Sequence, residues 1–307
     1  MNNKEFFSLI PNFVLIPTKE DKNTIYKIVN NDKVLLIFDY LYMRTDRIGT
    51  TLFSIGDIIE TYGLTQRKGR DGVNNQIRDI LRALIELKYI KLLNEINIET
   101  VNKNTFVKCK LNINYKNNFF ILKNSELKTI LNIDNTYDKI KLLKLYCIIK
   151  ARVYTRKGGN NGINIHNTDK TGICYPSYKK IQSEIDISEG TINKYIQKLK
   201  ELNLIDYANA GVCYHKVSKI KKETPNIYVL YTKDKLHEDE LYASIKYYKR
   251  SMIEKGYVFV DDEEGYKNNV RKINGELGGL TRLKNEGLAT PEQLKRIEQI
   301  NKMNISL

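Results

Sequence analysis

The chain has no long apolar run, few cysteines and few histidines. No stretch approaches the roughly 18 apolar residues that a membrane-spanning helix needs, and the start of the sequence lacks the apolar core of a signal peptide. The four cysteines form no Cys-x-x-Cys pair, a pattern typical of reduced, buried thiols rather than of a disulfide framework. We therefore expect a cytoplasmic protein that does not contact a membrane.

Residues typical of catalytic and metal sites are also scarce. The sequence has no Gly-x-x-x-x-Gly-Lys-Ser/Thr loop for nucleotide phosphates. No two of its three histidines lie at metal-ligand spacing, and Cys213 with His215 would be only half of a zinc site. The adjacent carboxylates of 261–264 are typical of a solvated acidic turn. A nucleophilic tyrosine among the 21 tyrosines stays open, but we predict no enzymatic activity, no cofactor and no bound metal.

Basic residues exceed acidic ones, and the excess lies in one part of the chain. The 307 residues suffice for two or three domains with buried cores. The net charge is +15 at pH 7. From Leu236 onward, twelve basic residues balance twelve acidic ones, so the whole excess lies in residues 1–235. Such a region is typical of a protein that binds nucleic acid; a solvated basic surface is the alternative.

One pattern of apolar and capping residues occurs twice in that basic region. The second copy has the spacing of two helices, the turn between them and a strand, at Ser177, Ile181, Ile185, Ile187, Ser188, Ile192, Ile196, Leu199, Leu202, Leu204 and Ile205. The first copy repeats it with eight extra residues in the middle, at Ser54, Ile58, Tyr62, Leu64, Thr65, Ile77, Leu81, Leu84, Leu87, Tyr89 and Ile90. Each copy predicts a winged helix-turn-helix, which presents a polar helix to a DNA groove.

The duplication extends upstream of the helix-turn-helix. At a constant offset of 106 residues, Asp32–Lys33 matches Asp138–Lys139. We expect each copy to begin with a short extended apolar segment, Phe13–Ile16 in the first and Phe119–Leu122 in the second, followed by a long helix.

These patterns predict an α+β, mostly helical fold with two tandem winged helix-turn-helix domains. The expected parts are an amino-terminal extended segment, a first winged-helix domain, a linker segment, a second winged-helix domain and a small helical carboxy-terminal region, at residues 1–31, 32–118, 119–137, 138–235 and 236–307.

The second winged-helix domain has the clearer pattern. Its first helix is expected over 138–154, with one buried face at Ile140, Leu143, Cys147 and Ala151. Ser177 is expected to cap the second helix and Ser188 the third, over 189–202. Strands over 204–207 and 226–231 would form a hairpin, and their long connection would be the wing.

The first domain and the carboxy-terminal region are interpreted in the same way. The first domain is expected to have helices over 32–44, 55–62 and 73–88 and strands over 51–53, 90–93 and 106–112. The carboxy-terminal region is expected to have a helix over 238–255 and a last helix whose first turn contains Pro291. Thr290 and Gln293 have the spacing of a capping box for that last helix.

In a winged helix the third helix enters the major groove. With Ile192, Ile196 and Leu199 buried, the outward face of the second domain's third helix carries Thr191, Asn193, Lys194, Gln197 and Lys198. Asn and Gln can contact adenine through two hydrogen bonds, and Lys can reach guanine or phosphate. The corresponding candidates in the first domain are Asn74, Asn75, Gln76, Arg78 and Arg82. Any one of them could be an ordinary solvated residue, but as a set they predict base reading.

Two basic loops are expected to add contacts to phosphate. The wing of the second domain carries His215, Lys216, Lys219, Lys221 and Lys222. The insertion beside the first domain's third helix carries Arg67, Lys68 and Arg70.

The sequence YPSYKKIQSEIDISEGTINKYIQKLKELNLIDY, residues 175–207, resembles the winged-helix module common in bacterial regulators and replication proteins. The paired units, each opening with a segment such as NFFILKNSEL, are similar to the tandem winged-helix replication initiators of Gram-positive plasmids and phages. The resemblance covers about residues 10–235. The insertion before Asn74 and the loop Arg156–Gly172 depart from a plain winged helix.

The resemblance implies a function and partners. In such initiators two winged-helix domains grip repeated origin sites in double-stranded DNA, and one of them often forms a homodimer interface. Asn193, Lys194 and Gln197 would read bases, the first domain would share DNA binding with dimerisation, and the carboxy-terminal region would recruit host replication proteins.

Three functions stay open from the sequence. The first is a replication initiator of a mobile element that binds origin repeats without catalysis. The second is a transcriptional or plasmid-segregation regulator that binds an operator or centromere. The third is a protein-interaction scaffold that no longer binds DNA, and the charge confined to residues 1–235 disfavours it.

Overall fold

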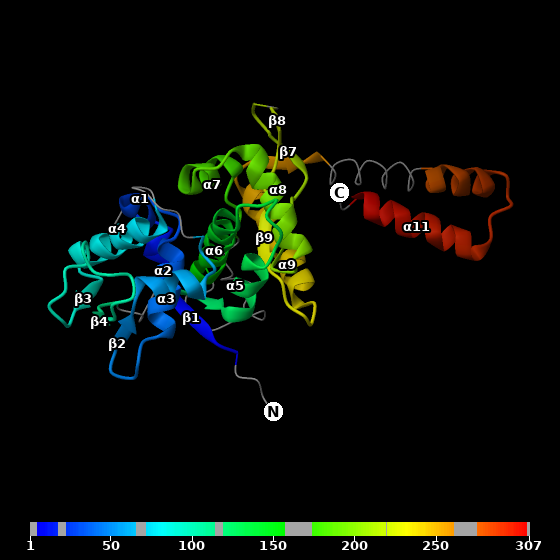
Figure 1. Ribbon diagram of the computed structural model, residues 1–307. Helices are drawn as coiled ribbons and strands as arrows, with labels where there is room; N and C mark the ends of the chain where they lie inside the picture. The colour runs from blue at the N-terminus through cyan, green and yellow to red at the C-terminus, as the bar shows by residue number, and fades with distance from the viewer. Residues whose placement is uncertain are drawn as a thin grey trace. The chain divides into compact units, whose positions relative to one another are not determined.

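The computed structural model describes residues 5–17, 23–65, 72–113, 119–156, 174–218, 220–260 and 275–305. The chain divides into two compact units. The larger unit comprises residues 1–208 and 225–245, and the smaller unit comprises residues 209–224 and 246–307. Helices predominate over strands among the described residues, and the fold class is α+β, as predicted (Figure 1).

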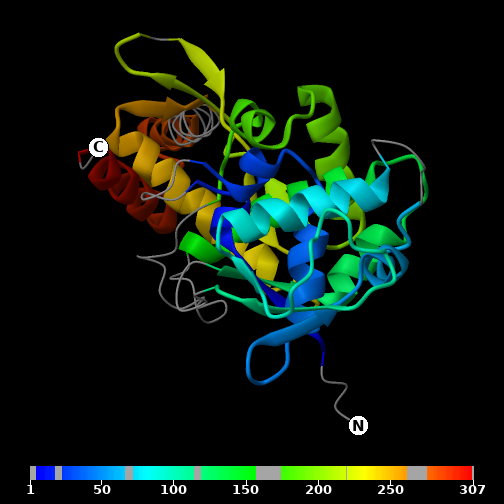
Figure 2. The ribbon, with the colours of Figure 1, turned by 60° about the vertical axis from the view of Figure 1, so that its left-hand side comes forward.

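The first half of the larger unit contains the elements predicted for the first domain. Their order is α2 (Val34–Met43), β2 (Thr50–Phe53), α3 (Ile55–Thr61), α4 (Val73–Glu86), β3 (Ile90–Leu92) and β4 (Val107–Leu111). The strands form an antiparallel sheet in the order β2-β4-β3. Figures 1 and 2 show α4 lying across α2. The boundaries agree with the sequence-based ones to within two residues.

Among the described residues, the second half repeats the order of the three helices and the last two strands, with an isolated bridge where the first half has β2. It contains α6 (Lys139–Arg156), α7 (Tyr178–Ile185), α8 (Glu189–Glu201), β6 (Ile205–Ala208) and β9 (Ile227–Leu230). β6 and β9 pair antiparallel, with Ile205 opposite Leu230, and Cys174 forms an isolated bridge to Tyr228. The predicted helices and the predicted hairpin of the second domain are therefore confirmed.

The segments before each half differ from the expectation. Residues 1–31 were expected to be extended, but they contain β1 (Phe7–Pro11), the 3-10 helix η1 (Asn12–Val14) and α1 (Ile25–Val29). Residues 119–137, expected to be a linker, form β5 (Phe119–Lys123) and α5 (Asn124–Leu131). β1 pairs antiparallel with β5, so the chain start closes a small sheet with the segment between the two halves.

The prediction that Phe13–Ile16 is extended is wrong, and the reason is local. The carbonyl oxygen of Asn12 accepts hydrogen bonds from the backbone N–H groups of Leu15 (3.0 Å) and Ile16 (2.7 Å), which closes a turn. The ring of Phe13 stacks on Tyr89, with 5.1 Å between centroids. Its counterpart Phe119 stays extended because it pairs with Pro11 at the end of β1.

Between residues 142 and 153, α6 is buried on every side, whereas the sequence predicted a single buried face, and Ile140, expected on that face, is half-buried. Leu142, Leu145 and Ile149 are buried together with Leu143, Cys147 and Ala151. Three cations of α6 are also buried, and each pairs with an acid from a distant segment: Lys144 with Asp32, Lys150 with Glu126, and Arg152 with Glu184. Burial lowers the pKa of Lys144 and Lys150, and the paired carboxylates oppose that shift.

The smaller unit contains both strands and helices. β7 (Val212–His215), β8 (Lys221–Glu223) and β10 (Tyr257–Phe259) form an antiparallel sheet in the order β10-β7-β8. The remaining elements are the end of α9 (Leu236–Glu254), helical residues 275–285 and α11 (Pro291–Ile305). The region from residue 236 onward, expected to be helical, also contains the strand β10, which pairs with the wing strand β7.

The predicted capping box opens α11. The backbone N–H of Gln293 donates to Thr290 Oγ1 at 3.3 Å, and the backbone N–H of Thr290 donates to Gln293 Oε1 at 2.8 Å. Two donors that the helix itself leaves unpaired are thereby satisfied.

Candidate nucleic-acid interface

A tight turn joins α7 to α8, and a serine caps the start of each helix. Ser177 Oγ accepts a hydrogen bond from the N–H of Lys180 at 3.3 Å, and Ser188 Oγ accepts one from the N–H of Thr191 at 3.4 Å. Asp186 ends α7 in the left-handed conformation, with φ of 49°, which Asp tolerates better than most residues. Both predicted serine caps are confirmed.

The two faces of α8 differ in burial as the sequence predicted. Ile192, Tyr195, Ile196 and Leu199 are buried against the core. On the outward side the predicted base-reading residues are exposed (Asn193, Lys194 and Gln197) or half-buried (Thr191 and Lys198). α8 therefore presents polar side chains on a rigid helix.

Replacing Ile192 with alanine tests this assignment of faces. The side chain is fully buried, so its truncation leaves a cavity and is expected to lower the free energy of unfolding by about 2–5 kcal/mol. Gln197→Ala, one turn away on the exposed face, should change it by less than about 0.5 kcal/mol. Urea denaturation measures both values, and equal values would contradict the assignment.

Asn193 is held by a relay of hydrogen bonds that the sequence did not reveal. The hydroxyl of Tyr178 donates to Asn193 Oδ1 at 3.2 Å and accepts from Asn226 Nδ2 at 3.1 Å. Tyr178 begins α7 and Asn226 precedes β9, so three elements fix one amide. A fixed amide loses less side-chain entropy when it contacts a base. No sequence signal connects positions so far apart.

The lysines of α8 lie around a tyrosine that was not predicted. Lys194 Nζ is 4.8 Å and Lys198 Nζ 5.4 Å from the ring centroid of Tyr137, which precedes α6. Lys198 also pairs with Glu201 at 3.0 Å, and that hydrogen bond raises the pKa of the Lys198 ammonium. Lys198 is therefore cationic at neutral pH.

The corresponding residues of α4 are engaged within the larger unit. Gln76 Oε1 accepts from Lys33 Nζ at 2.7 Å. Arg78 donates to Asn75 Oδ1 (2.8 Å) and to the carbonyl oxygen of Val101 (2.9 Å). Asn74 is half-buried, and its Oδ1 has no hydrogen-bond partner among the described residues. The expectation that this set points outward to solvent is corrected, because Lys33, which precedes α2, and the segment between β3 and β4 both contact α4.

Arg82 is exposed, but acidic neighbours compensate its charge. Its guanidinium lies 3.1 Å from Glu99 and 2.8 Å from Asp79, and the hydrogen bond from Arg82 to Glu99 is the main cause of its raised pKa. A cation that already has two carboxylate partners attracts a phosphate less strongly. Of the predicted base-reading residues, α8 exposes three (Asn193, Lys194 and Gln197) and α4 exposes only Arg82, so α8 is the more accessible of the two predicted reading helices.

The wing residues belong to the smaller unit. Lys216, Lys221 and Lys222 are exposed and His215 is half-buried, and Lys222 Nζ lies 3.0 Å from the hydroxyl of Tyr257. Four other predicted phosphate contacts lie outside the described residues, namely Lys219, Arg67, Lys68 and Arg70.

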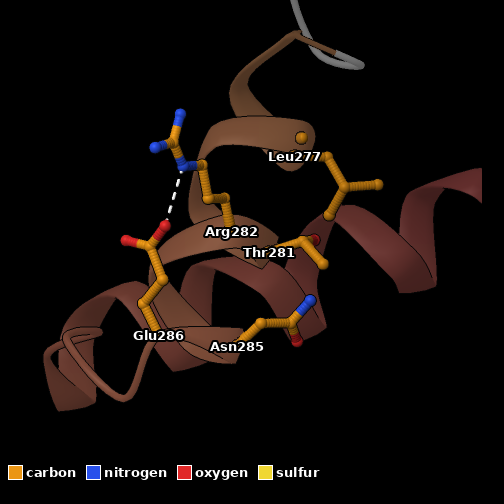
Figure 3. Close-up of a pocket in the computed structure, with 6 residues that line it drawn as sticks. Leu277, Thr281, Arg282, Asn285 and Glu286 are labelled. Carbon is orange, nitrogen blue, oxygen red and sulfur yellow. Dashed lines mark hydrogen bonds and ion pairs between the residues drawn. The ribbon is translucent and has the colours of Figure 1, made fainter.

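A surface hollow in the smaller unit is lined by one helical segment. Its lining residues are Leu277, Gly278, Thr281, Arg282, Asn285 and Glu286, and Arg282 and Glu286 form an ion pair at 2.9 Å along one side of this segment (Figure 3). The lining has the ordinary composition of a helix surface. In the described part of the chain no three His, Cys, Asp or Glu residues cluster in a way that could hold a metal ion.

Comparison with known families identifies a domain that includes α7 and α8. Residues 163–205, which include both helices and the first residue of β6, match a family described as a helix-turn-helix domain. No curated protein matches the chain. None of the described helices combines the length and apolar character needed to cross a bilayer. The chain therefore carries a helix-turn-helix domain, which indicates that this protein binds DNA.

Proposed function

We propose that this protein binds double-stranded DNA sequence-specifically through two tandem winged-helix domains and initiates replication at the repeated origin sites of a plasmid or phage. It would do so without catalysing a reaction itself. The observation that carries the proposal is the exposed polar face of α8, where Asn193, Lys194 and Gln197 lie opposite a fully buried aliphatic face.

Two further observations support the proposal. The order of helices and hairpin strands in the first half of the larger unit recurs in the second half, and two similar readers on one chain suit a site made of repeats. The net charge of +15 resides in residues 1–235, the part that contains both halves. A basic surface of this kind raises affinity for the phosphate backbone.

The two halves would have different tasks. α8 would read bases in the major groove and the wing lysines would contact phosphate. Since the polar residues of α4 are engaged within the larger unit, the first domain would mainly position the chain on DNA and form a homodimer interface. The carboxy-terminal region would recruit host replication proteins.

Footprinting on genomic fragments selected by the full-length chain tests this function. Direct repeats within an origin, together with replication of a reporter plasmid only when the protein is supplied in trans, would support it. A protected operator overlapping a promoter would replace the initiator with a regulator. No binding to any duplex would contradict DNA binding altogether.

Removal of the wing lysines should weaken binding to every sequence. We expect the combined Lys216→Ala, Lys221→Ala and Lys222→Ala variant to flatten the slope of log affinity against log salt by about 0.9 for each phosphate that the variant no longer neutralises. Fluorescence anisotropy at several salt concentrations measures that slope. The matched control is the triple alanine variant of Lys246, Lys284 and Lys295, which are exposed in the carboxy-terminal region, where no contact to DNA is proposed. Equal slopes in both variants would contradict the wing assignment.

A further inference from the structure

The hairpin between β7 and β8 ends in two exposed apolar side chains. Val217 is 85% exposed and Ile220 is 71% exposed. Both are β-branched aliphatic residues at the end of a hairpin that projects from its sheet in Figures 1 and 2. Single exposed apolar residues are common on protein surfaces, but Val217 and Ile220 together give this hairpin an apolar tip.

Lysines flank this apolar tip in the sequence. Lys216 comes directly before Val217, and Lys221 and Lys222 follow Ile220; all three are exposed. Such a tip suits a partner that offers anionic groups around a narrow apolar space. Duplex DNA offers this in its minor groove, where phosphates border the groove and the faces of stacked bases lie inside it.

The base of the hairpin is braced by a third strand. β10 pairs with β7, with Tyr257 opposite His215, and their rings lie 5.1 Å apart. The N–H of Lys216 donates to the carbonyl oxygen of Gly256 at 2.9 Å. Gly256 has φ of 84°, a conformation that favours glycine, and a Cβ there would lie 3.2 Å from His215 Nε2.

Two side-chain contacts lie along the hairpin. His215 Nδ1 accepts a hydrogen bond from the N–H of Val217 at 3.3 Å. Lys222 Nζ lies 4.1 Å from the ring centroid of Tyr257. Both strands of the hairpin therefore contact β10.

We infer that Val217 and Ile220 form an apolar wedge that enters the minor groove of bound DNA, separates a base step and bends the duplex. Inserted aliphatic side chains of this kind kink DNA by roughly 20–90°. The inference rests on the proposed function, because it requires that the chain bind DNA. It adds that the wing changes the shape of the DNA as well as contacting phosphate.

The test measures bending and binding on one DNA probe. The probe is a duplex selected for tight binding from a random-sequence library and labelled at its two ends with a fluorescence donor and acceptor. The full-length chain is compared with the Val217→Thr/Ile220→Thr variant, which keeps β-branched side chains on the hairpin but removes the apolar tip. The matched control is Ile48→Thr/Leu52→Thr, which changes two other exposed aliphatic residues.

We expect the unchanged chain and the control to raise energy transfer between the two ends, and the wedge variant to bind within a few-fold of them while leaving energy transfer at the value of the free duplex. Bending by the wedge variant equal to that of the unchanged chain would overturn the wedge and leave DNA binding intact. Binding without bending by the unchanged chain would do the same. No binding to any duplex would overturn both proposals. Binding of the unchanged chain to anionic phospholipid vesicles, abolished in the wedge variant while bending persists, would assign the tip to a membrane instead.

Discussion

Replacing Glu184 with alanine is expected to lower the free energy of unfolding by about 3–5 kcal/mol, because it leaves a buried guanidinium without its carboxylate. Arg152 Nη2 lies 2.5 Å and 2.6 Å from the two carboxylate oxygens of Glu184, and both residues are buried. Arg152 Nη1 already has no hydrogen-bond partner among the described residues. Urea denaturation followed by circular dichroism measures the loss.

Two comparisons separate a buried charge from a general effect of removing glutamate. Glu201→Ala removes an exposed partner of Lys198 and should cost no more than about 1 kcal/mol. The double variant Arg152→Met/Glu184→Leu replaces the pair with apolar side chains of similar size and should recover most of the stability. A loss in Glu184→Ala no larger than that in Glu201→Ala would contradict the buried ion pair.

This ion pair also matters for the helix-turn-helix. Glu184 lies in the last turn of α7, and Arg152 lies in α6, so the pair ties the helix-turn-helix to the central helix of the larger unit. We therefore expect Glu184→Ala to reduce DNA affinity through misplacement of α7, even though Glu184 is buried and contacts no DNA.

The sequence predicted the parts of the fold that depend on local chemistry. Apolar residues at helical spacing located α8, and the serine caps at 177 and 188 located the starts of α7 and α8. The capping box at Thr290 located α11. Periodicity and capping operate within one or two helical turns, and a single sequence contains that information.

Other features depended on contacts between distant residues. Lys144, Lys150 and Arg152 resemble solvated residues in the sequence, but acids 24 to 112 positions away make their burial possible. The short strand β10 has no pattern of its own and exists because β7 offers it a partner. A single sequence carries no pairing information of this kind.

The candidate site shows the same division. The outward face of α8 followed from helical periodicity, and its exposure is as predicted. For α4, the same periodicity predicted Gln76, Arg78 and Arg82 as readers. Their partners Lys33, Val101 and Glu99 come from segments whose return onto the helix depends on tertiary packing. Periodicity identified the outward side of each helix but could not show what else lies there.

The double variant Asn193→Ala/Gln197→Ala is expected to lose most of the sequence discrimination of this protein. An amide that contacts adenine through two hydrogen bonds contributes about 1–3 kcal/mol of discrimination. Removal of two such amides should cost about 2–6 kcal/mol, roughly 30-fold to 10⁴-fold in preference for the selected duplex over an unrelated one. Competition anisotropy with the two duplexes measures this ratio. Binding to the unrelated duplex should hardly change, since lysines supply the contacts to phosphate.

The matched variant on the other helix is Gln76→Ala/Arg82→Ala. Gln76 bonds to Lys33, and Arg82 bonds to Asp79 and Glu99, so we expect preference for the selected duplex to change by no more than a few-fold. Both double variants should keep the circular dichroism spectrum and unfolding midpoint of the unchanged chain, apart from the small cost of exposed substitutions. If the α4 variant lost discrimination and the α8 variant kept it, the reading helix would be α4, with the intramolecular bonds of Gln76 and Arg82 exchanged for bonds to DNA on binding.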